Sequence, residues 1–394
     1  MGVISDILAQ HTEYRRSTLN LIPSENIMFD EARQVLSSDL VHRYVNPEGF
    51  YGGTKFTDEI VEKTKQLAED LFGADYAFVE PLSGHIADLC AVFAFTKAGD
   101  KVMLVSPEDG GYPLDLEHLE RKPVYFPFDR ETWNIDISKA EEKIKSEKPS
   151  LIILGQSFYL FPHPVKQIAS VADDLNIPVV YDGSHVLGLI AGEQFQNPFK
   201  EGAKIIVGST HKTFPGPQGG VIVGLGGYGK AEFAEVLGMP LVLVDNPHLH
   251  RIAALGVTIE KFKPIAKDYA QRVVKNAQTL ANELDKRGVL VGFSKLGYTK
   301  SHQVYLPVKS MDEGKKIYQK LEKAGIIADC AVRLGTQEVT MLGMEEEDMK
   351  TIAEFIADVL VDGKEPEKVK KDVMEFVKHF TIVEEHKEEK KKIN

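Results

Sequence analysis

Short apolar runs alternate with stretches of helical spacing through the middle of the chain, and this alternation constrains the fold more than any other feature. The predicted strands cover residues 76–79, 101–105, 124–126, 151–154, 179–182, 205–208 and 220–223. The predicted helices between them cover residues 58–72, 83–97, 137–146 and 165–176. Strands that alternate with helices favour a mainly parallel, doubly wound sheet with helices on both faces. We therefore predict an α/β fold whose ligands bind beyond the carboxyl ends of the strands.

The rest of the chain indicates a second, smaller region. A glycine-rich segment at 224–229 ends the predicted sheet, and a helical pattern runs from 249 to 287. A strand at 303–308 and helices at 312–324 and 345–361 predict a smaller αβ unit. We expect five parts: an N-terminal arm at 1–30, a large cofactor-binding domain at 31–228, linking helices at 229–286, a small C-terminal αβ domain at 287–383 and a charged tail at 384–394.

Composition argues against several classes of function. The formal net charge of −12 disfavours a nucleic-acid partner, because phosphate binding depends on a basic surface. The two cysteines, Cys90 and Cys330, provide neither a disulfide framework nor the paired spacing of a metal site, and we predict no metal. No run reaches about 18 apolar residues, and the N-terminus lacks a secretory pattern. We expect a cytoplasmic protein without a membrane segment.

Lys212 carries the strongest chemical signal in the sequence. It follows a short apolar strand, has hydroxyl residues beside it and is followed by the glycine-rich backbone of 216–220. A lysine in this setting suits a buried amine that forms a Schiff base with an aldehyde cofactor. Asp182 and His185 close another predicted strand. Together these residues predict pyridoxal phosphate, with Asp182 beside the pyridine nitrogen and His185 either at the ring substituents or holding Asp182 in place.

Other residues meet the remaining needs of this cofactor and of an amino-acid substrate. The turn Ser83-Gly84-His85 precedes a helix, whose free N–H groups and dipole suit a phosphate. Tyr112 follows the turn Gly110-Gly111 and is a candidate to stack on the ring. Arg333 is the candidate for the substrate carboxylate, because a guanidinium matches a carboxylate in a two-pronged fork.

Several separated segments together resemble the serine hydroxymethyltransferase family, whose members are pyridoxal phosphate enzymes of the aspartate-aminotransferase fold type (fold type I). The resemblance extends from about residue 10 to residue 375. It is carried by Leu21-Ile22-Pro23-Ser24-Glu25-Asn26, Tyr51-Gly52-Gly53, the segment 71–76, Asp182-Gly183-Ser184-His185-Val186-Leu187-Gly188, the lysine segment 209–220, and Arg333-Leu334-Gly335-Thr336.

The resemblance implies a role for each matching position. Lys212 would bind the cofactor aldehyde, Asp182 would pair with the pyridine nitrogen, and His185 would lie near the ring hydroxyl. Arg333 and Ser24 would hold the substrate carboxylate. Further residues expected at the cofactor are Ser83, Gly84, His85, Tyr112, Thr210, His211 and Gly219. Residues expected at a site shared between two subunits are Tyr44 and Tyr51, so a homodimer with shared active sites is implied.

Four positions depart from the family pattern. Tyr112 stands where the family usually has a histidine, and a tyrosine stacks but does not exchange protons near neutral pH. The glutamate that relays protons normally lies two residues beyond the first tyrosine; here Glu48 is the candidate, in a shortened segment. Gln218 replaces a frequent arginine, and the loop before Arg333, which helps enclose folate in the family, is nearly absent.

The resemblance implies a hydroxymethyltransferase that converts serine to glycine, with Lys212, Asp182, His185, Glu48 and Tyr51 as catalytic residues and a reduced pterin, tetrahydrofolate or an analogue, as the one-carbon acceptor. The departures leave two alternatives open. One is a pterin-independent aldolase or transaldolase acting on threonine-like β-hydroxy amino acids, which also breaks the bond between Cα and Cβ. The other is a pyridoxal phosphate-binding homologue without catalytic activity.

Overall fold

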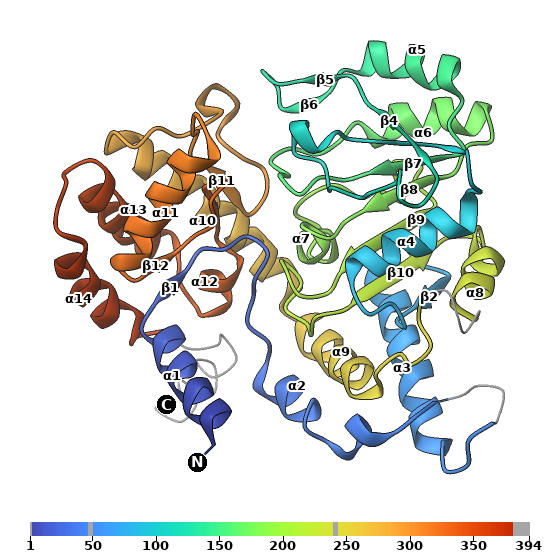
Figure 1. Ribbon diagram of the computed structural model, residues 1–394, viewed down its shortest axis with the longest axis horizontal. Helices are drawn as coiled ribbons and strands as arrows, with labels where there is room; N and C mark the ends of the chain where they lie inside the picture. Colours follow the sequence, from blue (N-terminus) through green and yellow to red (C-terminus); the bar gives the residue numbers. More distant parts are fainter. Residues whose placement is uncertain (1, 46–49, 239–242, 381–394) are drawn as a thin grey trace. The chain divides into compact units, whose positions relative to one another are not determined.

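The computed structural model describes residues 2–45, 50–238 and 243–380 (Figure 1). The chain divides into two compact units, which are described separately. Residues 26–270 form the sheet unit, and residues 1–25 together with 271–394 form the terminal unit. The chain passes from the sheet unit into the second part of the terminal unit within helix α10, Ala266–Lys286. Within the described ranges, no helix has both the length and the apolar character needed to cross a bilayer.

A seven-stranded sheet is the centre of the sheet unit. Its strands follow the order β2-β10-β9-β8-β7-β3-β4. The neighbours from β9 to β4 pair in parallel, whereas β10 is antiparallel to both β9 and β2. The strand bounds are β2 Tyr76–Phe78, β3 Lys101–Leu104, β4 Lys122–Tyr125, β7 Leu151–Leu154, β8 Val179–Asp182, β9 Ile205–Ser209 and β10 Gly220–Gly224. The prediction of a mainly parallel sheet is therefore confirmed.

The central strands are buried on both faces, which explains why the sequence shows continuous apolar runs rather than an alternating pattern. On one face, Val207 and Ile222 belong to the same core cluster as residues of α4 and α8. Residues that alternate with them, such as Ile152 and Ile206, are buried as well. The sheet is thus covered from both sides.

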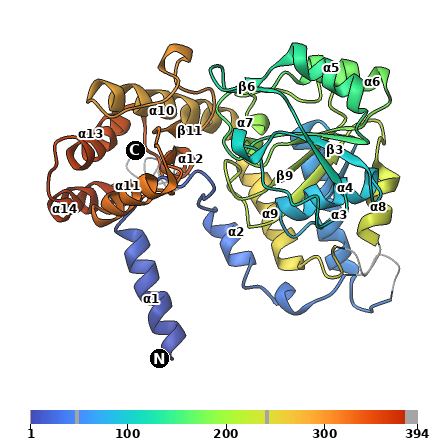
Figure 2. The same ribbon diagram turned by 45° about the horizontal axis from the view of Figure 1, so that its top comes forward.

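The helices of the sheet unit pack in pairs. Helices α5 and α6 lie side by side, and so do α3 and α9 (Figures 1 and 2). The helix bounds are α2 Asp30–Val35, α3 Lys55–Phe72, α4 Gly84–Phe95, α5 Ile137–Glu147, α6 Val165–Asp174, α7 Leu187–Ala191, α8 Lys230–Gly238 and α9 Leu249–Phe262. The helical pattern predicted over 249–287 forms two helices, because Pro264 lacks the N–H that a continuous helix would need.

The terminal unit is an αβ assembly with very short strands. Strand β1 (Leu19–Asn20) pairs in parallel with β12 (Ile326–Ile327), and β11 (Gln303–Tyr305) pairs antiparallel with β13 (Arg333–Gly335). Its remaining helices are α1 Val3–Arg16, α11 Met311–Lys323, α12 Gln337–Met341, α13 Glu346–Leu360 and α14 Pro366–Val377. Helices α11 to α14 share a buried core with α10 and the short strands, and its members include Leu280, Leu334, Ile352 and Ile356. Helix α1 contributes no buried residue.

Candidate active site

A partly open cavity of about 200 Å³ lies in the sheet unit, where β7, β8 and β9 end and α4 begins. This is the place predicted for a ligand in an open parallel sheet. Eight of the residues expected at the cofactor line it, namely Ser83, Gly84, His85, Tyr112, Asp182, His185, His211 and Lys212. The cavity therefore brings together most of the cofactor residues proposed from the sequence.

Lys212 lies in the connection between β9 and β10, at the carboxyl end of β9. Strand β10 turns back antiparallel with Ser209 opposite Gly220, so the chain between them forms a hairpin loop. The side-chain amide of Asn26 donates a hydrogen bond to the Lys212 carbonyl (2.7 Å) and another to the Tyr269 hydroxyl (3.0 Å). The backbone of the lysine is therefore held from a segment far away in sequence.

Asp182 and His185 lie at the end of β8 and are almost fully buried. One carboxylate oxygen of Asp182 accepts a hydrogen bond from the Ser184 N–H (2.9 Å). Gly155, just after β7, permits the close approach of the two strand ends, because a Cβ there would lie 2.5 Å from the Asp182 carbonyl. The His185 carbonyl accepts from the Thr213 hydroxyl (2.9 Å), which joins this segment to the lysine loop.

The N-terminus of α4 faces the cavity with several hydroxyl groups beside it. Ser83 caps the helix, and its hydroxyl accepts from the Ile86 N–H (3.1 Å). A Cβ at Gly84 would lie 2.2 Å from the Ser209 hydroxyl, so only glycine lets the helix end approach β9 this closely. The Ser184 hydroxyl accepts from the Ser209 N–H (3.0 Å). Free helix N–H groups together with hydroxyls form a donor set that suits a phosphate.

Tyr112 also lines the cavity and contacts the N-terminal turn of α4. Its hydroxyl is hydrogen-bonded to His85 Nδ1 (3.0 Å), and the two rings meet edge to face with centroids 5.8 Å apart. Burial raises the pKa of Tyr112, and the nearby carboxyls of Asp88 and Asp182 raise it further. The phenol consequently stays protonated at neutral pH.

Three residues of the lysine loop have different surroundings. His211 lines the cavity, and burial, assisted by the charge of Lys212, lowers its pKa to about 4, so its ring is neutral. Thr210 and Gly219 do not line the cavity. The Thr210 hydroxyl donates to the Pro217 carbonyl (2.6 Å), and the Thr210 N–H donates to the Gly219 carbonyl (3.1 Å). These two residues brace the loop that carries Lys212.

Sequence reasoning missed five residues that also line the cavity: Asp88, Gln156, Ser157, Ser184 and Ser209. Gln156 and Ser157 follow β7, so the same rule that pointed to Asp182 and Lys212 could have found them. Asp88 is the one acidic residue of helix α4, whose other residues are apolar except for His85. An acidic residue among apolar ones in a helix could have indicated that Asp88 lines the site.

The residues present fit pyridoxal phosphate. An amine, a buried acid and an anion-binding helix end surround one cavity. Three buried polar atoms at its wall, Asp88 Oδ1, Gln156 Oε1 and His211 Nδ1, have no hydrogen-bond partner among the described residues. Buried polar atoms are normally paired, so these atoms indicate that the cavity is built for a polar ligand.

The two tyrosines proposed for a shared site lie elsewhere on the sheet unit. Tyr44 and Tyr51 are 51% and 41% exposed, and their ring centroids lie 5.3 Å apart. Neither lines the cavity of the single chain. Glu48, the proposed proton relay, lies outside the described residues.

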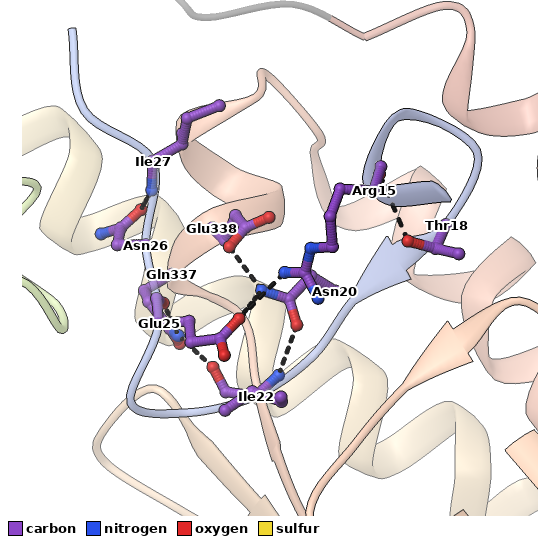
Figure 3. Close-up of polar contacts among 9 residues, drawn as sticks. All are labelled: Arg15, Thr18, Asn20, Ile22, Glu25, Asn26, Ile27, Gln337 and Glu338. Carbon is purple, nitrogen blue, oxygen red and sulfur yellow. Dashed lines mark hydrogen bonds and ion pairs between the residues drawn. The ribbon is translucent and has the colours of Figure 1, made fainter. Parts of the chain in front are cut away.

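Ser24 and Arg333 belong to the terminal unit, where hydrogen bonds connect their segments. Gln337, four residues after Arg333, donates from its side-chain amide to the carbonyls of Ile22 (2.7 Å) and Glu25 (2.6 Å) (Figure 3). The Gly335 N–H donates to the Leu21 carbonyl (2.7 Å). Arg333 itself is paired with Asp329, with 2.8 Å between Nη2 and Oδ2. The structure thus brings the segments of the two proposed carboxylate-binding residues together.

Glu338, a partly buried acid, is hydrogen-bonded to the same segment through Asn20. Asn20 donates from its side-chain amide to Glu338 (2.5 Å) and to Glu25 (2.9 Å), and Arg15 forms an ion pair with Glu25 (2.9 Å) (Figure 3). Burial raises the pKa of Glu338 to about 7, the charge of Glu25 raises it too, and Asn20 and Arg15 oppose the shift. Glu338 therefore changes its charge near neutral pH.

This fold and this set of donors define a pyridoxal phosphate-dependent enzyme of fold type I. The crystal structure of an L-threonine transaldolase from Pseudomonas fluorescens, in its internal aldimine state, matches with a TM-score of 0.90 and 28% identity, over 96% of this chain and 91% of that one. A sequence model of the serine hydroxymethyltransferase family matches residues 2–356. The chain belongs to the serine hydroxymethyltransferase family.

Named relatives agree with this assignment. Serine hydroxymethyltransferases from Methanocella arvoryzae and Staphylothermus marinus are each 40% identical to this chain over 96% of its length, and the matches cover 95% and 91% of the relatives. The predicted family, fold class and enzyme type are confirmed.

Proposed function

We propose that the protein interconverts serine and glycine with pyridoxal phosphate, and that the one-carbon unit passes to a reduced pterin. The observation that carries this proposal is the single cavity in which Lys212, Asp182 and the N-terminus of α4 meet. The serine hydroxymethyltransferase family model, which matches residues 2–356, supports the reaction type.

Lys212 and Asp182 would act at the two reactive positions of the cofactor. When bound, pyridoxal phosphate supplies a conjugated ring that takes up the electron pair left when the bond between Cα and Cβ breaks. The Lys212 amine binds the aldehyde carbon. The Asp182 carboxylate keeps a proton on the pyridine nitrogen, because a negative charge beside it favours the protonated form. Hydrogen bonds within the protein hold the backbone of Lys212 and the carboxylate of Asp182.

Other residues that line the cavity would bind the rest of the cofactor. Ser83, Gly84 and His85 present the helix N-terminus to the phosphate, where the helix dipole adds to the hydrogen bonds. Tyr112 packs against the ring. Because its pKa is raised, the phenol of Tyr112 stays neutral and does not exchange protons near neutral pH. Other groups must therefore carry out the proton transfers of the reaction. His185 contacts the ring substituents.

Ser24 and Arg333 would bind the carboxylate of the amino acid. The guanidinium of Arg333 is already oriented by Asp329, which reduces the entropy lost when a carboxylate binds. The hydrogen bonds from Gln337 hold the segment that carries Ser24. We propose that the two groups act together on the substrate carboxylate.

Tyr44, Tyr51 and Glu48 would complete the site across the interface of a homodimer. The two tyrosines are exposed in the single chain, and Phe50 and Phe56 beside them are 78% and 69% exposed. Several large aromatic side chains at one surface favour an interface with another chain. Glu48 is proposed as the proton relay and Tyr51 as its catalytic neighbour.

The test is an assay of glycine formed from serine, run with and without tetrahydrofolate. We expect glycine only when the pterin is present. Glycine formation that is equally fast without a pterin would contradict the proposed acceptor.

A pterin-independent transaldolase is the second candidate, and it rests on two observations. One is the structural similarity to the L-threonine transaldolase from Pseudomonas fluorescens. The other is the short connection at 328–332 between β12 and β13, which leaves little chain before Arg333 to enclose a pterin. Incubation with threonine and allo-threonine separates the candidates: fast aldehyde exchange without pterin supports the transaldolase.

A further inference from the structure

Asp88 is a buried acid that lines two hollows of the sheet unit. It lies in the second turn of α4, is 3% exposed, and lines the cofactor cavity. Asp88 also lines a second, much smaller hollow of about 10 Å³, whose wall is largely apolar and includes Leu104, Val105 and Ile153. Asp88 Oδ1 is fully buried without a hydrogen-bond partner among the described residues. An ionised carboxylate in this place would lose its hydration without a replacement.

Two neighbouring charged residues have opposite effects on the ionisation of Asp88. Asp182 disfavours a negative charge on Asp88, and Lys212 favours it. The pKa of Asp88 lies well above its usual range, chiefly because of burial and secondly because of Asp182. Burial also raises the pKa of Cys90 to about 12, so this thiol adds no charge. The other titratable groups at the cavity wall are Tyr112, His85, His185 and His211.

We propose that Asp88 is a cofactor-binding residue held as a neutral carboxylic acid, whose O–H donates a hydrogen bond to bound pyridoxal phosphate while Asp182 carries the negative charge. The inference rests on the proposed function, because it assumes that pyridoxal phosphate fills the cavity. A protonated carboxyl has one donor and a remaining acceptor site. Within the described part of the chain, no protein group is hydrogen-bonded to the buried Oδ1 of Asp88, so a bound cofactor could take that place. Two acids in one site thus take different roles, one neutral and one charged.

The first test measures the protonation of Asp88 without any cofactor. The ordinary pKa of an aspartic acid is near 3.8, and the pKa of Asp88 in the folded protein is higher. The folded protein therefore loses stability relative to the unfolded chain as the pH rises above 3.8. Asp88→Asn has nearly the same shape and cannot ionise. We expect the melting temperature of the apo variant to exceed that of the wild type at pH 8, and the difference to shrink towards pH 4.

A matched control is Asp174→Asn, at the exposed end of α6, for which we expect no such pH-dependent difference. If Asp88→Asn instead melts below the wild type at pH 8, Asp88 is ionised and paired with Lys212, and the proposal is overturned.

The second test measures the dissociation constant of pyridoxal phosphate and the visible absorbance of the bound cofactor. Asp88→Asn retains a donor, so we expect its dissociation constant to stay within about threefold of the wild type. Asp88→Leu has a similar shape without a donor, and we expect at least tenfold weaker binding with a shifted absorbance maximum. Wild-type affinity in the leucine variant, or equal weakening in both variants, would overturn the proposed hydrogen bond.

The two tests separate this inference from the proposed reaction. Both omit serine and pterin, so a protein that fails to transfer hydroxymethyl groups still gives a result for Asp88. The stability test also stands if the cavity binds a different ligand.

Discussion

Asn26 holds the backbone of Lys212 across 186 positions of sequence, through a hydrogen bond of 2.7 Å to the lysine carbonyl. Its amide also contacts the Tyr269 hydroxyl, which in turn donates to the Thr213 carbonyl (3.0 Å). The lysine loop is thus fixed by the segment that enters the sheet unit and by the helix that leaves it. The motif that contains Asn26 therefore contributes to the position of the proposed reactive amine.

Asn26→Ala should loosen this loop. The Lys212 carbonyl loses the hydrogen bond from Asn26, and the loss of one such bond costs about 0.5–1.5 kcal/mol of stability. We expect a lower melting temperature and weaker binding of pyridoxal phosphate. The matched control is Asn134→Ala, because Asn134 also donates its amide to a backbone carbonyl, that of Pro162 (2.8 Å), without lining the cavity. An equal change in cofactor affinity in both variants would argue against a specific role of Asn26.

Tyr112 should contribute its ring more than its hydroxyl. Tyr112→Phe loses only the hydrogen bond to His85, so we expect cofactor affinity within about threefold of the wild type. Tyr112→Ala removes the ring surface, and stacking of this kind contributes about 0.5–1.5 kcal/mol, or up to about tenfold in affinity. Spectroscopic titration with pyridoxal phosphate measures both variants. An equally large loss in Tyr112→Phe would show that the hydroxyl is the important group.

Arg333 should govern the affinity for the amino acid rather than for the cofactor. Arg333→Ala leaves the substrate carboxylate without its partner, which we expect to cost about 2–5 kcal/mol of binding free energy. Arg333→Lys keeps the charge but loses the fork, so it should restore binding only in part. The measurement is the apparent dissociation constant of serine, with the affinity for pyridoxal phosphate as the control. Unchanged serine affinity in Arg333→Ala would assign the clamp to another residue.

Glu338 should make the stability of the protein depend on pH between its usual pKa of 4.5 and its raised pKa of about 7. The native state binds the extra proton in this range, so the free energy of unfolding falls as the pH rises. Glu338→Gln avoids this loss, and its advantage should grow from near zero below pH 4.5 to at most about 3 kcal/mol above pH 7. Denaturant unfolding at several pH values measures it, with the exposed Glu59→Gln as the control. A constant difference at all pH values would contradict a buried, titrating Glu338.

Much of the sheet could be predicted because each buried strand is a distinct apolar run. The ends of β7, β8 and β9 lie within one residue of the predicted positions, and these ends define the cavity. The antiparallel direction of β10 was not predictable from its own residues, since an apolar run has no direction. The hairpin at 210–219 sets it, because that connection contains no crossover helix.

The parts of the site that escaped prediction depend on tertiary contacts. Strands β1 and β12 have two residues each, too few to show a pattern, yet their pairing holds the segment before Ser24. Asp88 was visible as an acid in an apolar helix, but its neighbour Asp182 comes from a strand far along the chain. The effect of one acid on the other arises only when the chain has folded.

The most direct test of the central claim is reduction of the purified enzyme with borohydride in the presence of pyridoxal phosphate, followed by peptide mass mapping. We predict one pyridoxyl group, attached to the ε-nitrogen of Lys212, and no label in Lys212→Ala. A label on a different lysine, or an unlabelled wild-type protein, would contradict the account.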